Sequence, residues 1–252
     1  MKVLNMKKNL VILMMSALGA SSLISSCTDL SSDKYFDDRK TLTTVFTDKT
    51  QTQEWLAYAY SFLQWGNQDV CSKGSTNHCF ADDMYYGDRD SQYGNNAVEE
   101  SYNAFKLGNY NEDWNQDCWN LGYKGIYQAS VFIHNVDMNT EMTEEDRIDY
   151  KGQARFVRAY YYWLLLRRYG PVPIMPDGGV DYTKSYDEVA TPRSTYEEVA
   201  QYIATEMEQA AKEIQFTKRD PDNICRPTKG AALATRALAY IYAASPLANG
   251  QL

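Results

Sequence analysis

Apolar residues recur with the period of an α-helix in five segments of the chain. In the segment 50–64, Trp55, Ala59 and Phe62 lie at i, i+4 and i+7, which places them on one helical face. The segment 112–136 has the same kind of face. Its spaced residues are Trp119, Tyr123, Ile126, Ser130 and Ile133. Both segments are therefore predicted to be amphipathic helices.

The third and fourth predicted helices carry start and stop signals. Thr143 can cap a helix that has Asp146 in its first turn, and Gly170 with the proline after it ends that helix. The apolar residues of its body are Phe156, Ala159, Trp163 and Leu166. The fourth helix opens with a capping box of Thr195 and Glu198. Its apolar stripe consists of Val199, Ile203, Met207, Ala210 and Ile214.

The fifth helix is predicted to start at Thr228, after Pro227, and to end before Pro246. Two stretches between the helices lack a helical period. Four prolines in 170–194 block a helix there and predict an extended connector. The stretch 66–111 is polar and rich in Gly, Asn, Asp and Tyr. A long irregular stretch inside a compact domain is usually functional or disordered, and its aromatic residues argue against disorder.

A motif of the third helix recurs in the fifth, 78 residues later. The matched pairs are Lys151 and Lys229, Gly152 and Gly230, Ala154 and Ala232, Arg158 and Arg236, Ala159 and Ala237, and Tyr162 and Tyr240. Two tetratricopeptide units span about 68 residues, and a proline connector would stretch this spacing towards the observed one. The motif therefore predicts stacked helix pairs. The alternative is a chance similarity between two helices rich in Ala and Tyr.

The first residues have the pattern of an export signal. Lys2, Lys7 and Lys8 precede an apolar stretch at 10–20 that is too short to span a bilayer. Ile-Ser-Ser then leads to Cys27 and resembles a lipobox, whose small residues let a peptidase reach the bond before the cysteine. We expect residues 1–26 to be a lipoprotein signal peptide and Cys27 to carry the lipid, which gives stable membrane anchoring. The alternative is an ordinary secretory signal that happens to contain a cysteine.

The negative net charge of the chain argues against binding of polyanions. Three of the 25 basic residues and none of the 33 acidic ones lie within 1–26, so the remaining chain carries a net charge of −11. Such a surface repels nucleic acid and anionic lipid headgroups. The 21 Tyr and 5 Trp residues suit either a helical core or a sugar-binding face.

Four cysteines follow Cys27, and their spacing gives no metal motif. Export permits disulfides, and these four residues allow three full pairings. They are Cys71, Cys79, Cys118 and Cys225. A local bridge between Cys71 and Cys79 is the leading prediction, and four free thiols are the alternative. The chain holds only two His residues and no C-x-x-C pair, so we predict no metal site and no cofactor.

Two long motifs resemble the signature of the SusD/RagB family. The first runs from Gly152 to Trp163 and continues as Arg-Tyr-Gly-Pro-Val-Pro-Ile at 168–174. The second runs from Thr228 to Leu247, and Tyr-Phe-Asp-Asp at 35–38 is similar to the family's first segment. The resemblance covers the chain from Cys27 to its end. One departure is Ser130, which lies where the family often has Asn.

The resemblance implies an all-α fold, a tetratricopeptide-like helix-pair scaffold with long irregular loop insertions. Residues 27–252 would form the N-terminal part of a SusD-like domain, because members are about twice this length and the chain ends in a loop after its fifth helix. Members are outer-membrane lipoproteins that capture oligo- or polysaccharides, or in some cases peptides, for a SusC-type TonB-dependent transporter. They are not enzymes. An acidic start after Cys27 is similar to the signal that sends such lipoproteins to the outer face.

The irregular stretch holds the candidate ligand residues. Sugars present apolar C–H faces and hydroxyl edges, so a site for them needs flat aromatic rings beside carboxylate and guanidinium groups. The candidates are Asp83, Tyr85, Tyr86, Arg89 and Tyr93, with Trp65 and Trp114 flanking the stretch. The alternative is a solvated loop whose tyrosines pack on the scaffold.

Other chemistry fits the sequence less well. Asp88, Asp90, Gln92 and Glu99 match positions of an EF-hand loop, but Tyr93 stands where the turn needs Gly. Paired loop acids could be read as a glycoside hydrolase site, yet adjacent acids are common in loops and no nucleophile or phosphate-binding motif is present. Arg155, Arg158 and Arg236 are expected to pair with acidic residues between helices rather than to bind a ligand.

Overall fold

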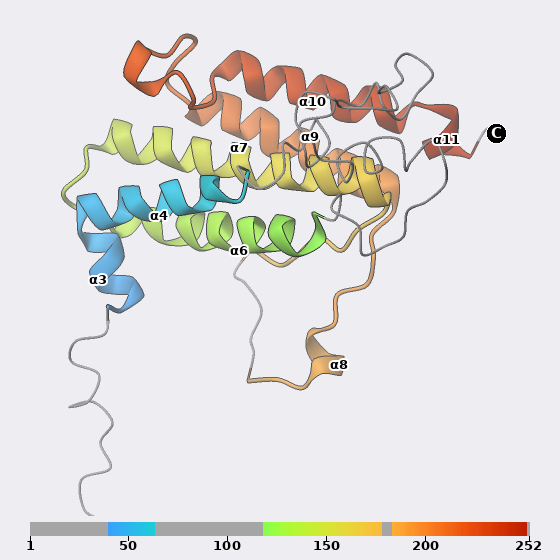
Figure 1. Cartoon of the computed structure of the whole chain (residues 1–252), viewed down its shortest axis with the longest axis horizontal. Helices are drawn as coiled ribbons and strands as arrows, with labels where there is room; N and C mark the ends of the chain where they lie inside the picture. The colour runs from blue at the N-terminus through green and yellow to red at the C-terminus, as the bar shows by residue number, and fades with distance from the viewer. Residues whose placement is uncertain (1–39, 64–117, 178–182, 251–252) are drawn as a thin grey trace, which may run out of the picture. The chain divides into compact units, whose positions relative to one another are not determined.

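The structure, a computed structural model, describes residues 40–63, 118–177 and 183–250 (Figure 1). All the regular structure assigned within these ranges is helical, which confirms the all-α prediction. The α-helices are α3 (Leu42–Thr47), α4 (Lys49–Ser61), α6 (Trp119–Asn135), α7 (Glu144–Tyr169), α8 (Tyr186–Val189), α9 (Tyr196–Glu213), α10 (Lys229–Ala243) and α11 (Pro246–Asn249). Two 3-10 turns, η3 (Val136–Met138) and η4 (Pro221–Asn223), complete the set.

The predicted helix ends are confirmed where local capping chemistry defines them. The Thr143 side chain accepts a hydrogen bond from the Asp146 backbone N–H at the start of α7, and Gly170 ends this helix with a φ of 69°. The capping box of Thr195 and Glu198 starts α9 with both of its reciprocal bonds in place. Thr228 caps α10 in the same way. These side chains satisfy backbone N–H groups that a helix start leaves without partners.

Four long helices follow one another as neighbouring layers, α6 on α7, α7 on α9 and α9 on α10 (Figure 1). Each is antiparallel to the next. Gly122 near the start of α6 lies beside Leu165 near the end of α7, and Gly125 lies beside the Tyr161 ring. A β-carbon on Gly125 would come within 2.4 Å of that ring, so only glycine allows this close approach. The order agrees with helix pairs that stack on each other.

The apolar core runs along α7 and α9. Every member of the predicted α9 stripe, from Val199 to Ile214, has an exposed fraction of 0%. From α7 the core receives Val157, Ala159 and Leu165, all fully buried. Burial of these side chains from two facing helices is the main source of stability for such a layer.

The start of α4 packs on a second, smaller core. Phe46 of α3 is fully buried, and its ring centroid lies 5.3 Å from that of Trp55 and 5.8 Å from that of Phe132 on α6. Leu56 is the more deeply buried neighbour, because Trp55 lies at the edge and donates its indole N–H to the Gln128 carbonyl at 3.1 Å. The predicted face of this helix was therefore right for Ala59 and Phe62 and shifted by one residue at Trp55.

Several boundaries differ from the predictions. The connector is not extended throughout, since α8 forms one helical turn in a part of it that has no proline. The second predicted helix begins at Trp119 instead of near residue 112, with Cys118 as its N-cap. The short elements α3, α11, η3 and η4 were not predicted, because three to six residues are too few to show a helical period.

No helix within the described ranges is long and apolar enough to cross a bilayer. The predicted signal peptide and Cys27 lie outside these ranges, and both stay predictions. Of the cysteines, Cys118 is a buried free thiol and Cys225 an exposed free thiol. The predicted bridge between Cys71 and Cys79 also lies outside the described residues.

Candidate functional site

The predicted ligand residues lie in a stretch whose two ends the scaffold holds. Trp65, Asp83, Tyr85, Tyr86, Arg89, Tyr93 and Trp114 are all outside the described residues, as is the loop that resembles an EF-hand. The described residues that border this stretch are Leu63 and Cys118, and both pack on the main core. The Cys118 backbone N–H donates to the Tyr169 hydroxyl at 2.8 Å. The described residues on both sides of the candidate loop are therefore packed on the scaffold.

An aromatic cluster surrounds the point where the stretch rejoins α6. The Trp119 ring centroid lies 5.0 Å from that of Tyr123 and 5.3 Å from that of Tyr169, and the Arg193 guanidinium lies 5.1 Å from the Trp119 centroid. Such ring pairs and cation–π contacts add to the stability gained from burial. We define Trp119, Tyr123, Tyr169 and Arg193 as the aromatic anchor. Trp119 and Tyr123 were predicted to share a helix face, but no pattern in the sequence indicated that they contact Tyr169 and Arg193.

The aromatic anchor and its neighbour Tyr162 also fix the start of the proline connector. The Tyr123 hydroxyl donates to the Pro173 carbonyl at 2.8 Å, and the Met175 N–H donates to the Tyr162 hydroxyl at 2.8 Å. Burial raises the pKa of Tyr162 to about 12, because the ionised phenolate would lose its hydration. Both hydroxyls therefore hold the backbone of the connector at residues 173–175.

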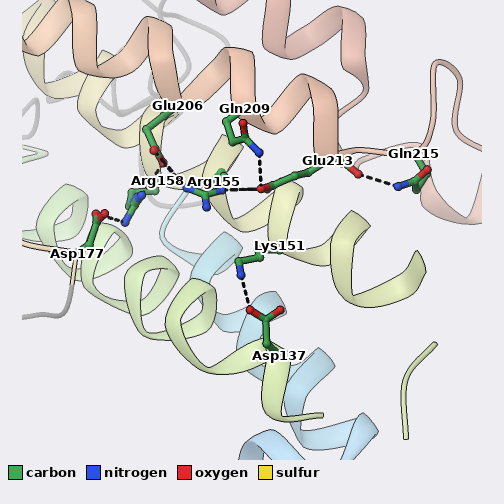
Figure 2. Close-up of polar contacts among 9 residues, drawn as sticks. All are labelled: Asp137, Lys151, Arg155, Arg158, Asp177, Glu206, Gln209, Glu213 and Gln215. Atoms are coloured by element: carbon green, nitrogen blue, oxygen red, sulfur yellow. Dashed lines mark hydrogen bonds and ion pairs between the residues drawn. The ribbon is translucent and has the colours of Figure 1, made fainter. Parts of the chain in front are cut away.

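A buried charge network ties α7 to α9 (Figure 2). Arg158 is 1% exposed and forms ion pairs with Glu206 and with Asp177, the latter at 2.7 Å. Arg155 reaches Glu206 at 3.3 Å and Glu213 at 2.9 Å. Burial by itself lowers the pKa of Arg158, but Tyr202, Glu206 and Asp177 outweigh it, and the pKa is raised. The guanidinium therefore stays charged inside the protein.

The network stabilises the scaffold by pairing the charges of two helices. A buried ion needs a partner, because its desolvation is not repaid otherwise. Here each arginine meets at least one carboxylate, and Gln209 donates to Glu213 at 2.9 Å (Figure 2). Arg236 of α10 pairs with Glu208 of α9 at 3.0 Å. The prediction that Arg155, Arg158 and Arg236 pair between helices is confirmed.

A second buried ion pair anchors the turn between α9 and α10. The Arg219 guanidinium contacts the Asp149 carboxylate of α7 at 3.2 Å, and both side chains are 5% exposed. The same carboxylate accepts hydrogen bonds from the Gln215 N–H at 2.9 Å and from the Gln153 side chain at 2.6 Å. The start of α10 is therefore fixed relative to α7. This pair was not predicted, because its two residues are 70 positions apart and no local pattern links them.

Two of the grooves among the described residues have mostly apolar borders. One of about 510 Å³ is bordered by Leu56, Tyr60, Tyr150 and Cys225. Another of about 760 Å³ is bordered by Arg168, Tyr196, Tyr242 and Leu247 among others. Within the described part of the chain, no group of His, Cys, Asp or Glu residues could hold a metal ion. The two grooves offer apolar and aromatic surface, which suits binding of a ligand.

Comparison with known proteins places this scaffold in a family. Residues 75–242, more than half of the chain, match the SusD-like family described as starch-binding and associating with the outer membrane. A SusD-like protein, P25, of Formosa agariphila is 37% identical over 57 residues, which are 23% of this chain and 11% of that protein.

Solved structures share the fold. A SusD-like protein from Bacteroides fragilis superposes with a TM-score of 0.63 at 20% identity, over 83% of this chain and 37% of that one. Surface glycan-binding protein A from Bacteroides thetaiotaomicron, in complex with laminarihexaose, gives a TM-score of 0.58 at 19% identity, over 77% of this chain and 39% of that one. The chain thus spans less than half the length of these relatives. With its stacked helices and its matched motifs, the chain belongs to the SusD-like family of proteins that associate with the outer membrane.

Proposed function

We propose that this protein captures an oligo- or polysaccharide at the cell surface and delivers it to a SusC-type TonB-dependent transporter. The family match carries the proposal, because residues 75–242 include most of the candidate loop as well as the scaffold from α6 to α10. Binding without turnover is the expected activity. Family members are binding proteins, and the buried arginines of this scaffold, Arg155, Arg158 and Arg219, are paired with carboxylates.

The scaffold supports a binding role for the candidate loop. A ligand site gains affinity when its groups are held in place before binding, since less conformational freedom is then lost. The loop's borders, Leu63 and Cys118, pack on the main core, and the Cys118 N–H donates to Tyr169 of the aromatic anchor. We therefore expect Asp83, Tyr85, Tyr86, Arg89 and Tyr93, with Trp65 and Trp114 at the edges, to contribute sugar contacts.

We further propose that residues 1–26 are removed and that Cys27 is lipidated, with the protein facing outwards. This rests on the leader pattern and the lipobox-like sequence before Cys27. In a bacterial host, replacement of Cys27 by Ser should abolish incorporation of labelled palmitate and release the protein from the membrane fraction. Protease treatment of intact cells should digest the parent protein if it faces outwards. Retained lipid labelling in the variant would contradict the assignment of Cys27.

Affinity electrophoresis tests glycan capture directly. The chain from Thr28 onwards would be run through native gels that contain starch, laminarin or other polysaccharides, with release of reducing sugar assayed alongside. We expect one glycan to retard the protein with no sugar released. Released sugar would identify a hydrolase instead, and binding of peptides without binding of any glycan would identify peptide capture.

Variants then test the loop. Replacement of Tyr85, Tyr86 or Tyr93 by Ala should weaken retardation about two- to tenfold each, the range expected for loss of one aromatic contact. Tyr127→Ala is a matched control, because Tyr127 is an exposed tyrosine of α6, 44% accessible, outside the candidate loop. Equal retardation of the loop variants and the control would exclude the loop as the site.

A further inference from the structure

The groove of about 510 Å³ lies between α4, the start of α7 and the segment that leads into α10. Its apolar and aromatic wall includes Leu56 and Tyr60 of α4 and Tyr150 of α7, and its third side is bordered by Cys225 and Arg226. We call it the α4 groove. Its volume lies within the range of small-ligand sites, about 300–1,000 Å³, and such sites combine apolar walls with a few polar groups.

Arg226 brings a positive charge to this groove without a carboxylate to balance it. Its guanidinium lies 5.2 Å from the Tyr150 ring centroid, and its Nη1 donates to the Gln153 side-chain oxygen at 3.4 Å. Neither partner carries a charge, and within the described ranges no carboxylate pairs with this guanidinium. The scaffold arginines that do pair with carboxylates are Arg155, Arg158, Arg219 and Arg236. A guanidinium presents a planar fork of N–H donors that matches a carboxylate, so Arg226 is suited to bind an anionic ligand group.

The other polar and aromatic groups of the groove suit a sugar ring. Tyr60 and Tyr150 border it with flat aromatic surface, which packs well against the C–H face of a sugar. The Gln53 side-chain amide donates to the Tyr150 hydroxyl at 3.0 Å, and this bond orients the amide. The carbonyl oxygen of the same amide is an acceptor for a ligand hydroxyl. The contact between Arg226 and Tyr150 holds the guanidinium in place before binding, so less conformational freedom is lost.

We infer that the α4 groove binds a uronic acid residue of the captured glycan, with the sugar carboxylate on Arg226 and the ring against the tyrosines. The inference rests on the proposed glycan capture and narrows it to glycans that carry an acidic sugar. The chain after residue 26 has a net charge of −11, so isolated acidic residues among neutral sugars fit it better than a polyuronate does. Leu63 borders the groove, and the candidate residue Trp65 follows it by two positions. The groove and the candidate loop would then hold different residues of one glycan.

Alkylation of Cys225 reports whether the groove is occupied, because this exposed free thiol lies on its border. The chain from Thr28 would be treated with iodoacetamide, a neutral reagent, at increasing concentrations of methyl glucuronide or methyl galacturonide. Peptide mass spectrometry follows position 225 separately from the other cysteines. At saturation we expect at least one uronide to slow this alkylation about fivefold or more, since bound ligand shields the groups beneath it. The matched neutral methyl glucoside and galactoside should need at least about tenfold higher concentrations, because they form no charge-assisted bond.

Variants locate the binding in the groove. Arg226→Gln should weaken protection by the uronide at least about tenfold, and Arg226→Lys should lie between this variant and the parent, because lysine keeps the charge but not the fork. Arg236→Gln is the matched control, since it removes one positive charge outside the groove and should bind as the parent does. Ala57→Trp tests the groove without changing Arg226. Ala57 is an exposed groove residue of α4, so the larger side chain should fill the space and abolish protection while circular dichroism shows an intact helical fold.

The result that would overturn the inference is distinct from failure of glycan capture. Absence of protection by both uronides, equal protection by a uronide and its neutral glycoside, or unchanged protection in Arg226→Gln would each overturn it. Protection by an N-acetylated dipeptide with a free C-terminal carboxylate, and by no uronide, would do so in favour of a peptide. The polysaccharide gels test capture separately. Retardation by a glycan without protection of Cys225 by any uronide would remove this inference and leave glycan capture in place.

Discussion

The helices α7 and α10 carry the same motif but lie in different surroundings. In α7 the motif residues Arg158, Ala159 and Tyr162 are each at most 1% exposed. In α10 their counterparts are accessible: Tyr240 is 41% exposed and the Arg236 side chain 35%. The reason is the number of covering layers, since α7 lies between α6 and α9 whereas α10 packs mainly on α9, with a smaller contact to α7. Burial therefore follows from position in the stack and not from the motif.

The largest difference in stability between the two copies of the motif is expected when a charge is introduced at equivalent positions in α7 and α10. Ala159→Glu places a carboxylate where the side chain is 0% exposed, and its desolvation should cost about 5 kcal/mol or more, enough to unfold a domain of ordinary stability. Ala237→Glu lies at an exposed position of α10 and should change the free energy of unfolding by less than about 0.5 kcal/mol. Urea unfolding followed by circular dichroism measures both. Similar losses would show that α10 is covered in solution.

The next contrast concerns the motif arginines. Arg158→Met leaves Glu206 buried with a weaker set of partners, and breaking such a pair should cost about 3 kcal/mol. Arg236→Met removes a half-exposed pair with Glu208 and should cost less than about 1 kcal/mol. The same unfolding measurement separates the two variants. High salt should weaken the Arg236 contribution more than that of Arg158, because dissolved ions screen an exposed pair more than a buried one.

Alanine variants of the two motif glycines should differ in stability by a smaller amount. Gly152→Ala forces a β-carbon against the end of α9, and this overpacking should cost about 2 kcal/mol. Gly230→Ala meets open space and should be neutral or slightly stabilising, since alanine favours helix. Thermal unfolding of the two variants beside the parent protein checks the prediction. A loss of stability in Gly230→Ala would mean that a close neighbour already lies there.

The motif tyrosines should show the smallest effect at neutral pH. Tyr162→Phe removes the acceptor of the Met175 N–H and should cost about 1 kcal/mol, whereas Tyr240→Phe removes an exposed contact to Gln201 and should cost less.

The contribution of Tyr162 to stability should also depend on pH in the alkaline range. Burial raises its pKa from 10.0 to about 12, so the folded state holds the hydroxyl proton more tightly than the unfolded state does. The stabilisation is complete below pH 10 and is lost as the pH rises towards 12. Unfolding curves at these pH values should therefore fall less steeply for Tyr162→Phe than for the parent protein. Parallel curves would show that Tyr162 is not buried in solution.

Much of the scaffold could be predicted because its signals are local. Thr143, Thr195 and Thr228 cap helices through bonds to residues three positions away, so sequence spacing is enough to locate them. All five residues of the predicted α9 stripe are buried, because they share one helical period, and the buried face of α9 also includes Ala200 and Ala204. Trp55 was misplaced because α3 and α6 both contact α4 at this residue, and periodicity cannot show how these helices share the space.

The candidate site was predictable only as a set of residue types. Aromatic and charged residues in 66–111 indicate a sugar site by their chemistry, but their mutual placement depends on backbone that has no period to read. The aromatic anchor shows the same limit within the described residues. Tyr123 and Arg193 meet at Trp119 although they are 70 residues apart in the chain, and no local signal links them.

The sequence by itself determined where the long helices start and stop, which side of α9 is apolar, and that one motif occurs twice. These properties depend on neighbours within one or two helical turns. Only the tertiary structure decided that the motif is a buried contact surface in α7 and an exposed one in α10. It also decided that Asp149 and Arg219 meet inside the protein. The physical reason is that burial and ion pairing depend on which helices are brought together, and those contacts join residues far apart along the chain.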